Sequence, residues 1–249
     1  MSPSSAPARL PAERGSAPVR GAWLREVWHS SIGKKVIVAI TGLVLGLYVL
    51  VHVLGNLKAF QGAGGGEPAI NAYAEWLRTF GEPAIPREGV LWLLRAVLLF
   101  CLVVHVIGVV QLAGRNRAAR PAGYPAPRIQ RSLASRTMLW GGIALLVFIV
   151  FHILHFTTGT IDPTGSFATG NVFGNMSEAF ESPVLVAIYV AAAVLIGFHL
   201  YHAFWSVLQT AGWDKPNRNP TFRRGATATA VLVGVGFAAV PLAFFTGVL

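Results

Sequence analysis

Residues 30–57 read SSIGKKVIVAITGLVLGLYVLVHVLGNL: two lysines, and after them 22 residues without a Lys, Arg, Asp or Glu. About 20 apolar residues in a row cross the hydrocarbon core of a bilayer as one α-helix. Similar stretches follow along the chain, and the predicted membrane spans are 36–57, 90–112, 138–157, 184–208 and 227–248. The sequence therefore predicts an all-α membrane protein, a bundle of five transmembrane helices.

The composition of the whole chain agrees with this fold class. Hydrophobic residues make up 54% of the 249 residues and charged residues 12%, about half the charged share of a typical soluble domain. So little charge cannot cover a soluble surface, which excludes an ordinary soluble enzyme. Residues 1–29 contain no apolar stretch, and we expect a flexible cytoplasmic arm there, followed by one transmembrane domain over residues 30–249.

The basic residues decide the predicted orientation. Of the 20 Lys and Arg residues, 16 lie before the first span, between the second and third, or between the fourth and fifth. Loops rich in Lys and Arg stay in the cytoplasm, so the N-terminus is expected in the cytoplasm and the C-terminus outside. This topology accounts for the net charge of +10. Anionic lipid is then an expected partner, and nucleic acid is not.

Histidines are the chemically distinctive residues of the spans. Ionisable residues inside a bilayer are costly and usually mark function. For any single histidine the alternative is a hydrogen bond to a neighbouring helix. Such packing explains less well a set of six spread over the first four spans. The six are His52, His105, His152, His155, His199 and His202.

The depths of these histidines fall into two groups. Measured from the basic residues at the cytoplasmic end of each span, His52 and His152 lie about 25 and 24 Å deep. His105 lies about 15 Å deep on the second span, with His202 at about 19 Å and His199 at about 24 Å on the fourth. Two imidazoles on facing helices are what a bis-histidine b-type haem requires. The sequence thus predicts two haems, one toward each side of the membrane.

The same residues carry a resemblance to a known family. Residues 30–57, 103–121 (VVHVIGVVQLAGRNRAARP), 135–156 (SRTMLWGGIALLVFIVFHILHF) and 197–213 (GFHLYHAFWSVLQTAGW) resemble, in this order, its first four helices. The family is the cytochrome b anchor subunit of succinate dehydrogenases and fumarate reductases, of the single-chain type with five helices and two haems. The N-terminal arm and the fifth span carry no motif of this family.

The resemblance implies axial ligands for two haem irons. It implies that His52 and His152 hold the distal b haem, near the outer face. It implies that His105 and His202 hold the proximal b haem, near the cytoplasmic partner subunits. His199, one helical turn before His202, stays open as the alternative proximal ligand.

Further polar residues lie near the two predicted haem levels. Arg95 is expected to pair with a distal haem propionate or to extend to the membrane surface. For His155, and for His199 if it is not a ligand, bonding to a propionate, a part in quinone or proton transfer, and simple packing all stay open. Candidates for binding a quinone or the proximal propionates are Ser31, Lys35, Arg136, Trp205 and Gln209, at the cytoplasmic ends of the first, third and fourth spans. Topology alone also places Lys35 and Arg136 there.

The function implied by the resemblance is electron transfer in a respiratory complex of the bacterial cytoplasmic membrane. Electrons from succinate would reach this chain from an iron–sulfur subunit and reduce menaquinone or another quinone, and fumarate reduction would use the same parts. Succinate would be oxidised on a flavoprotein partner, so no catalytic residue for that step is expected here. The basic loop between the second and third spans is a candidate docking surface for these partners. A higher oligomer of the whole complex stays open.

Two alternatives stay open at this point. The chain could be the cytochrome b subunit of another respiratory complex, of the formate dehydrogenase or hydrogenase type. It could also be a haem-free transporter or proton channel with a histidine relay.

Overall fold

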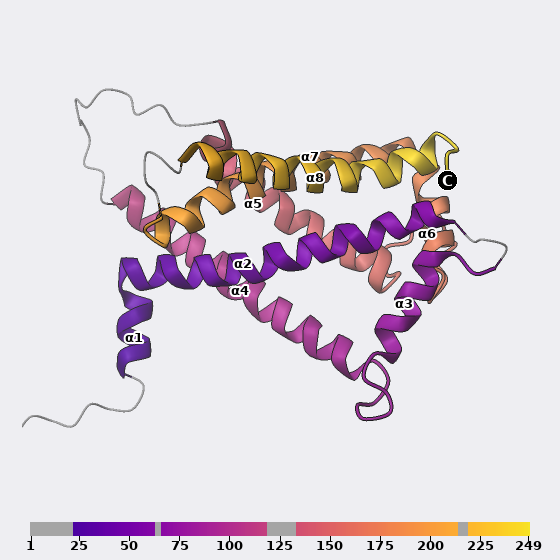
Figure 1. The fold of residues 1–249 in the computed structure, drawn as a ribbon, viewed down its shortest axis with the longest axis horizontal. Coiled ribbons are helices and arrows are strands. Elements are labelled where there is room, and N and C mark those ends of the chain that lie inside the picture. The colour runs from indigo at the N-terminus through magenta and orange to yellow at the C-terminus, as the bar shows by residue number, and fades with distance from the viewer. Residues whose placement is uncertain (1–21, 63–65, 119–132, 214–218) are drawn as a thin grey trace, which may run out of the picture.

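The computed structural model of the chain describes residues 22–62, 66–118, 133–213 and 219–249. These residues form helices and no strand (Figure 1). The elements are α1 (Ala22–His29), α2 (Ser31–Asn56), η1 (Leu57–Gln61), α3 (Ala69–Thr79), α4 (Gly89–Ala118), α5 (Leu133–His152), η2 (Ile153–Thr157), α6 (Val172–Phe180), α7 (Pro183–Thr210) and α8 (Asn219–Phe245). The segment η1 is a 3-10 helix and η2 is a π-helix.

Five helical segments are long and apolar enough to cross a membrane, which confirms the predicted fold class. They are Ser31–Gln61, Gly89–Ala118, Met138–Thr157, Pro183–Thr210 and Asn219–Phe245. Several extend beyond the predicted spans, because helical hydrogen bonding continues through the polar interface, where hydropathy no longer marks the chain. At the other extreme, α8 ends at Phe245, before the predicted end, since Gly247 has φ 72° and closes the helix.

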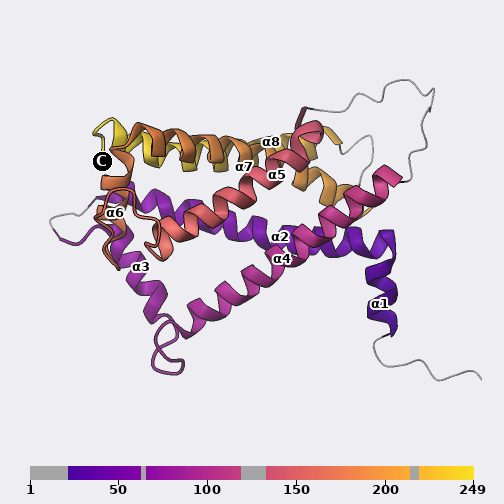
Figure 2. The same cartoon turned by 180° about the vertical axis from the view of Figure 1, so that it is seen from behind.

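The spanning helices form an uneven bundle (Figures 1 and 2). Helices α7 and α8 lie side by side, α2 packs against both of them, and α5 packs on α7. Helix α4 packs on the first half of α2, crosses it, and runs away from it toward α3. Helix α4 is therefore attached to the bundle mainly through one neighbour.

Glycines bring α7 and α8 together at close range. A β-carbon at Gly197 would lie 3.2 Å from the carbonyl oxygen of Ala230, and one at Gly234 would lie 3.3 Å from that of Ala193. Small residues let the backbones of membrane helices approach in this way. This contact fixes α7, the helix that carries two of the six histidines.

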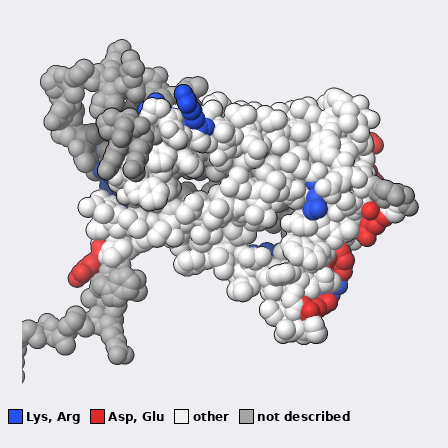
Figure 3. All heavy atoms as spheres, in the orientation of Figure 1, with Lys and Arg blue, Asp and Glu red and all other residues white. Residues whose placement is uncertain are grey.

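Two short helices close one end of the bundle. Helices α3 and α6 pack against each other at the end where the C-terminus lies (Figure 1). The Asn71 side chain joins them, since its Oδ1 accepts from the backbone N–H of Phe173 at 2.9 Å. Most acidic side chains visible in Figure 3 gather at this end. The described part of the chain begins, with α1, at the opposite end.

The predicted N-terminal arm ends in a helix. Residues 1–21 lie outside the described residues, but α1 forms just before α2, and the Ser30 hydroxyl caps α2 by accepting from the Gly33 N–H at 2.9 Å. The sequence of α1 has Trp and Leu at 23 and 24, and Val and Trp at 27 and 28. Apolar residues at a spacing of four give the amphipathic pattern of a helix at a membrane surface.

Candidate functional site

One histidine pair, which we call the outer pair after its predicted side of the membrane, consists of His52, on α2, and His152, the last residue of α5. Their ring centroids lie 5.9 Å from each other, with an angle of 77° between the ring planes. The two residues are 100 positions apart in the sequence and come from different spans. The structure therefore places next to each other the two histidines for which the sequence predicts equal depth.

Aromatic rings surround the outer pair. Tyr48 stacks on His52 at a centroid distance of 5.3 Å, and Phe237 of α8 lies 5.6 Å from the same ring. Phe148 stacks on His152 at 5.8 Å. Such walls exclude water and are typical of sites for planar apolar cofactors.

Arg95 lies on the same side as the outer pair. Its guanidinium stacks on the ring of Trp92, on the same helix, at 4.7 Å. The residue is half-buried. No contact joins Arg95 to His52 or His152 within the described residues, so the propionate contact stays a prediction.

The second pair, which we call the inner pair after its predicted side of the membrane, consists of His105 on α4 and His199 on α7. Their ring centroids lie 6.5 Å apart with an interplanar angle of 63°. His202 is half-buried one turn further along α7, and no ring contact joins it to His105 within the described residues. Of the two candidates left open by the sequence, His199 is the one that faces His105.

The ring of His105 is held by α2. Its Nδ1 lies 3.2 Å from the carbonyl oxygen of Val38 and 3.4 Å from the hydroxyl of Thr41. A β-carbon at Gly42 would lie 3.0 Å from Cε1 of His105, so a side chain there would press on this ring. When Nδ1–H donates to the carbonyl, Nε2 keeps a free lone pair, which is the arrangement of metal-binding histidines.

The ring of His199 lacks a partner of this kind. Its Nδ1 is buried and has no hydrogen bond to any described residue. The β-carbon of a side chain at Gly142 would lie 3.7 Å from Cε1 of His199, so the ring packs against the bare face of α5. A buried polar atom without a partner costs about 1–3 kcal/mol. A bound group that orders or ligates this imidazole would offset that cost.

A third polar group lies beside the outer pair. The Tyr189 hydroxyl lies 2.9 Å from Nδ1 of His155 and 3.4 Å from Nδ1 of His152. His155 is only 4% exposed and lies within η2. Tyr189 was not among the predicted site residues. The signal that could have found it is that a tyrosine within an apolar span needs a hydrogen-bond partner.

Of the five residues predicted at the inner end, Ser31 and Trp205 contact different partners within the described part of the chain. Ser31 Oγ accepts from Arg115 at 3.4 Å, whereas the ring of Trp205 lies under Arg223 at 5.0 Å. Lys35 is exposed, and so is Gln209. Residue Arg136 is in α5, but its side chain lies outside the described part.

Lys34, the neighbour of the predicted Lys35, is the buried lysine at this end. It is 2% exposed, it donates to the side-chain oxygen of Gln111, and its ammonium lies 4.9 Å from the ring centre of Trp28. Helical spacing could have identified it, because residue 34 shares a face with Val38, four positions on, which contacts His105.

The ring separation in both histidine pairs agrees with that of the two axial ligands of a b-type haem. An iron bound by two imidazole nitrogens at about 2 Å each brings the ring centroids roughly 6 Å from each other, close to the 5.9 and 6.5 Å found here. A haem iron needs only two axial side chains. No group of three or more His, Cys, Asp or Glu able to hold a metal ion occurs among the described residues.

Comparison of the chain with family models, with curated proteins and with solved structures found no match. The family resemblance of the four motifs therefore stays a prediction.

Proposed function

We propose that the chain is the membrane-anchor cytochrome b subunit of a succinate:quinone oxidoreductase in the bacterial cytoplasmic membrane. In this proposal it spans the membrane five times, holds two b haems, and carries electrons between an iron–sulfur subunit and a quinone. The observation that supports it most is the pair of facing imidazoles at each of two levels, drawn from four different helices. A single structural histidine would need no such partner.

In the proposal, His52 and His152 are the axial ligands of the outer haem, and His105 and His199 those of the inner haem. His202 stays the alternative inner ligand, as the motif resemblance implies. When bound, haem b supplies a one-electron carrier at each level. Tyr189 touches the outer pair and lies ten residues before His199 on α7, so the two levels are about 15 Å apart along that helix.

The surrounding residues would fix and insulate these ligands. The Val38 carbonyl orients the inner ring of His105, and the rings of Tyr48, Phe148 and Phe237 keep water from the outer pair. Arg95 would offset the negative charge of an outer propionate. None of these residues transforms a dicarboxylate, and that reaction is assigned to a flavoprotein partner.

The quinone, menaquinone by the motif resemblance, is proposed at the inner end of the bundle. On α7, Trp205 would supply an aromatic wall and Gln209, four residues further on, a hydrogen-bond donor. Ser31 accepts from Arg115. The basic segment 115–136, proposed to dock the partner subunits, lies largely outside the described residues.

The test is a dithionite-reduced minus oxidised spectrum of the purified complex, with the haem content measured per polypeptide. We expect a b-type α band and two haems per chain. A preparation with no b-type absorption would refute the proposal and favour a haem-free histidine relay. The subunits that co-purify with the chain distinguish the proposal from the other respiratory complexes. A flavin-containing subunit supports the proposal, and a molybdenum or nickel subunit indicates a formate dehydrogenase or hydrogenase.

A further inference from the structure

A short chain of polar side chains runs through the apolar region beside the outer histidine pair. It consists of His152, Tyr189 and His155, with the Tyr189 hydroxyl 3.4 Å from Nδ1 of His152 and 2.9 Å from Nδ1 of His155. Four phenylalanine rings lie around Tyr189, with centroids 5.1–6.2 Å from its own: Phe148, Phe151, Phe156 and Phe180. Within this apolar cluster the Tyr189 hydroxyl has the two histidines as its hydrogen-bond partners.

The ligand role of His152 decides which atom of each of these three side chains carries the proton. A histidine that binds iron through Nε2 carries its proton on Nδ1, so Nδ1–H of His152 donates to the Tyr189 oxygen. The Tyr189 O–H is then free to donate to Nδ1 of His155. A neutral His155 in turn keeps its proton on Nε2. Each contact thus has one donor and one acceptor.

Local backbone geometry brings His155 into this chain. The π-helix η2 begins directly after His152, and the N–H of Thr158 donates to the carbonyl of Ile153, five residues back, at 3.0 Å. A π-turn interrupts the regular rotation of an α-helix and is often found at functional sites. In this protein it coincides with the approach of His155 to Tyr189.

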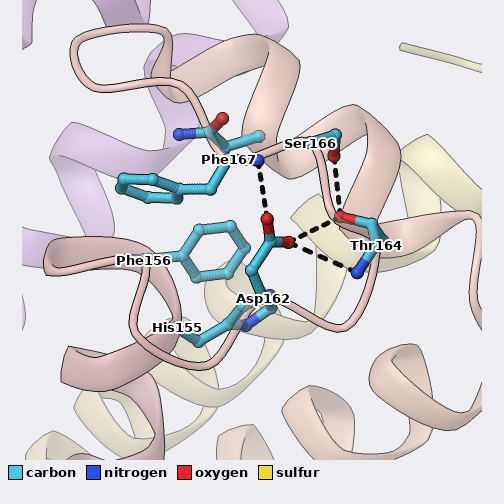
Figure 4. Close-up of a pocket in the computed structure, with 7 residues that line it drawn as sticks. His155, Phe156, Asp162, Thr164, Ser166 and Phe167 are labelled. Carbon is cyan, nitrogen blue, oxygen red and sulfur yellow. Dashed lines mark hydrogen bonds between the residues drawn. The ribbon is translucent and has the colours of Figure 1, made fainter.

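The His155 end of this row of polar side chains reaches the surface. His155 lines a pocket of about 190 Å³, including its open mouth, together with Asp162 (Figure 4). The Asp162 carboxylate accepts from the backbone N–H of Phe167 at 2.9 Å and of Gly165 at 3.0 Å. These hydrogen bonds, led by that of Phe167, lower the pKa of Asp162. A stable negative charge therefore lies beside His155 at the edge of the membrane.

We propose that Tyr189 and His155 are positioning residues for His152, and that their hydrogen-bond relay sets the reduction potential of the outer haem. This inference rests on the proposed function. An acceptor on Nδ1–H fixes the ring and makes the imidazole a more basic ligand, and hydrogen bonding around the ligands is one of the factors that set haem potentials. A more basic ligand stabilises the ferric state and lowers the potential.

The principal test is Tyr189→Phe in the complete complex, followed by redox titration and low-temperature EPR. This change keeps the ring and its aromatic contacts and removes only the hydroxyl. We expect both haems to be retained, the potential of one haem to rise, its low-spin EPR signal to change, and the other haem to be unaffected. The matched control is Tyr201→Phe on the same helix, whose hydroxyl has no hydrogen bond within the described residues.

A second variant tests the relay as a unit. His155→Leu removes the acceptor of the Tyr189 proton, and we expect it to raise the potential of the same haem by a smaller amount. The double variant with Tyr189→Phe should then shift the potential no further than Tyr189→Phe alone, because residues in one network are not additive. Additive shifts of the reduction potential, or a shift in the potential of the other haem, would contradict the proposed relay.

The outcomes also separate the two proposals. Two b haems in the unmodified complex, with potentials and EPR signals unchanged in Tyr189→Phe, refute the relay and leave the proposed function intact. No b haem in the unmodified complex refutes both.

Discussion

Nδ1 of His105 lies 3.2 Å from the carbonyl oxygen of Val38, so a backbone group of α2 holds a ring that α4 carries. The contact is possible because Gly42, one turn further along α2, has no side chain to displace the ring. A backbone acceptor of this kind fixes both the orientation and the tautomer of an imidazole. The inner site therefore depends on the seam between α2 and α4.

Replacing Gly42 should disturb only the haem that the proposed function assigns to the inner pair. In Gly42→Val the new side chain would begin 3.0 Å from Cε1 of His105 and push the ring off the Val38 carbonyl. We expect one of the two haems to be lost, as measured by the pyridine haemochrome assay and difference spectrum. Gly114→Val is the matched control, since a β-carbon there meets no atom within 4 Å. Full haem content in Gly42→Val would show that the ring position is irrelevant to binding.

The pairing of the outer site predicts which variants share a defect. His52→Ala and His152→Ala should each remove the same haem and leave the other, because the two rings face each other at 5.9 Å. Redox titration of the remaining haem identifies which one is lost. If His52→Ala and His105→Ala were to remove the same haem, the assignment of two levels would be wrong.

The inner site allows a direct choice between two histidines of α7. His199→Ala should abolish binding of the inner haem, since His199 faces His105 at 6.5 Å. His202→Ala should keep both haems. The reverse result, measured by the same spectra, would favour the ligand implied by the sequence motif over the one implied by the geometry.

Two adjacent lysines should differ in their effect on stability. Lys34 is buried and donates to Gln111 across the α2–α4 seam, whereas Lys35 is exposed. Thermal unfolding of the purified complex in detergent should show a lower Tm for Lys34→Ala and an unchanged Tm for Lys35→Ala. Equal effects of the two substitutions would contradict a structural role for the buried lysine.

The stability of the loop after η2 should depend on the negative charge of Asp162. Its folded pKa lies below the ordinary value of 3.8, chiefly because the Phe167 N–H donates to it. A carboxylate of lowered pKa stabilises the fold above its unfolded pKa, and this contribution is lost as the pH falls through the folded value. Hydrogen exchange at the Phe167 and Gly165 amides should therefore be slow at neutral pH and lose protection only below about pH 4. Asp162→Asn should lose part of that protection at neutral pH already.

Hydropathy was sufficient to predict the spanning helices and their order. It could not reveal α3 and α6, because these short helices combine apolar and polar residues, and a window as long as a span averages the two. Helix α1 was missed for the same reason and was assigned to a flexible arm. The membrane-spanning helices can thus be predicted from the composition of each segment. The surface helices can be predicted only from the periodicity of their apolar residues.

For the candidate site, the sequence predicts how deep each histidine lies along its helix. It does not predict which way the side chain points around the helix axis. His52 and His152 were paired by depth, and the structure places their rings together. His199 and His202 differ by less than one turn, so only the packing of α7 on its neighbours decides which of them faces α4. Tyr189 could not be found by depth, because its role depends on the π-turn after His152.

Because the helices are unevenly attached to the bundle, they should differ in how they assemble in the membrane. The hairpin of α7 and α8 is closed by its own backbone contacts, whereas α4 rests on α2 and carries many exposed apolar side chains. In the proposed function, a haem bound between His105 and His199 would hold α4 in its final place opposite α7. We therefore expect cells starved of iron to accumulate an incompletely assembled polypeptide. Membrane proteases should remove it before the proposed partner subunits disappear.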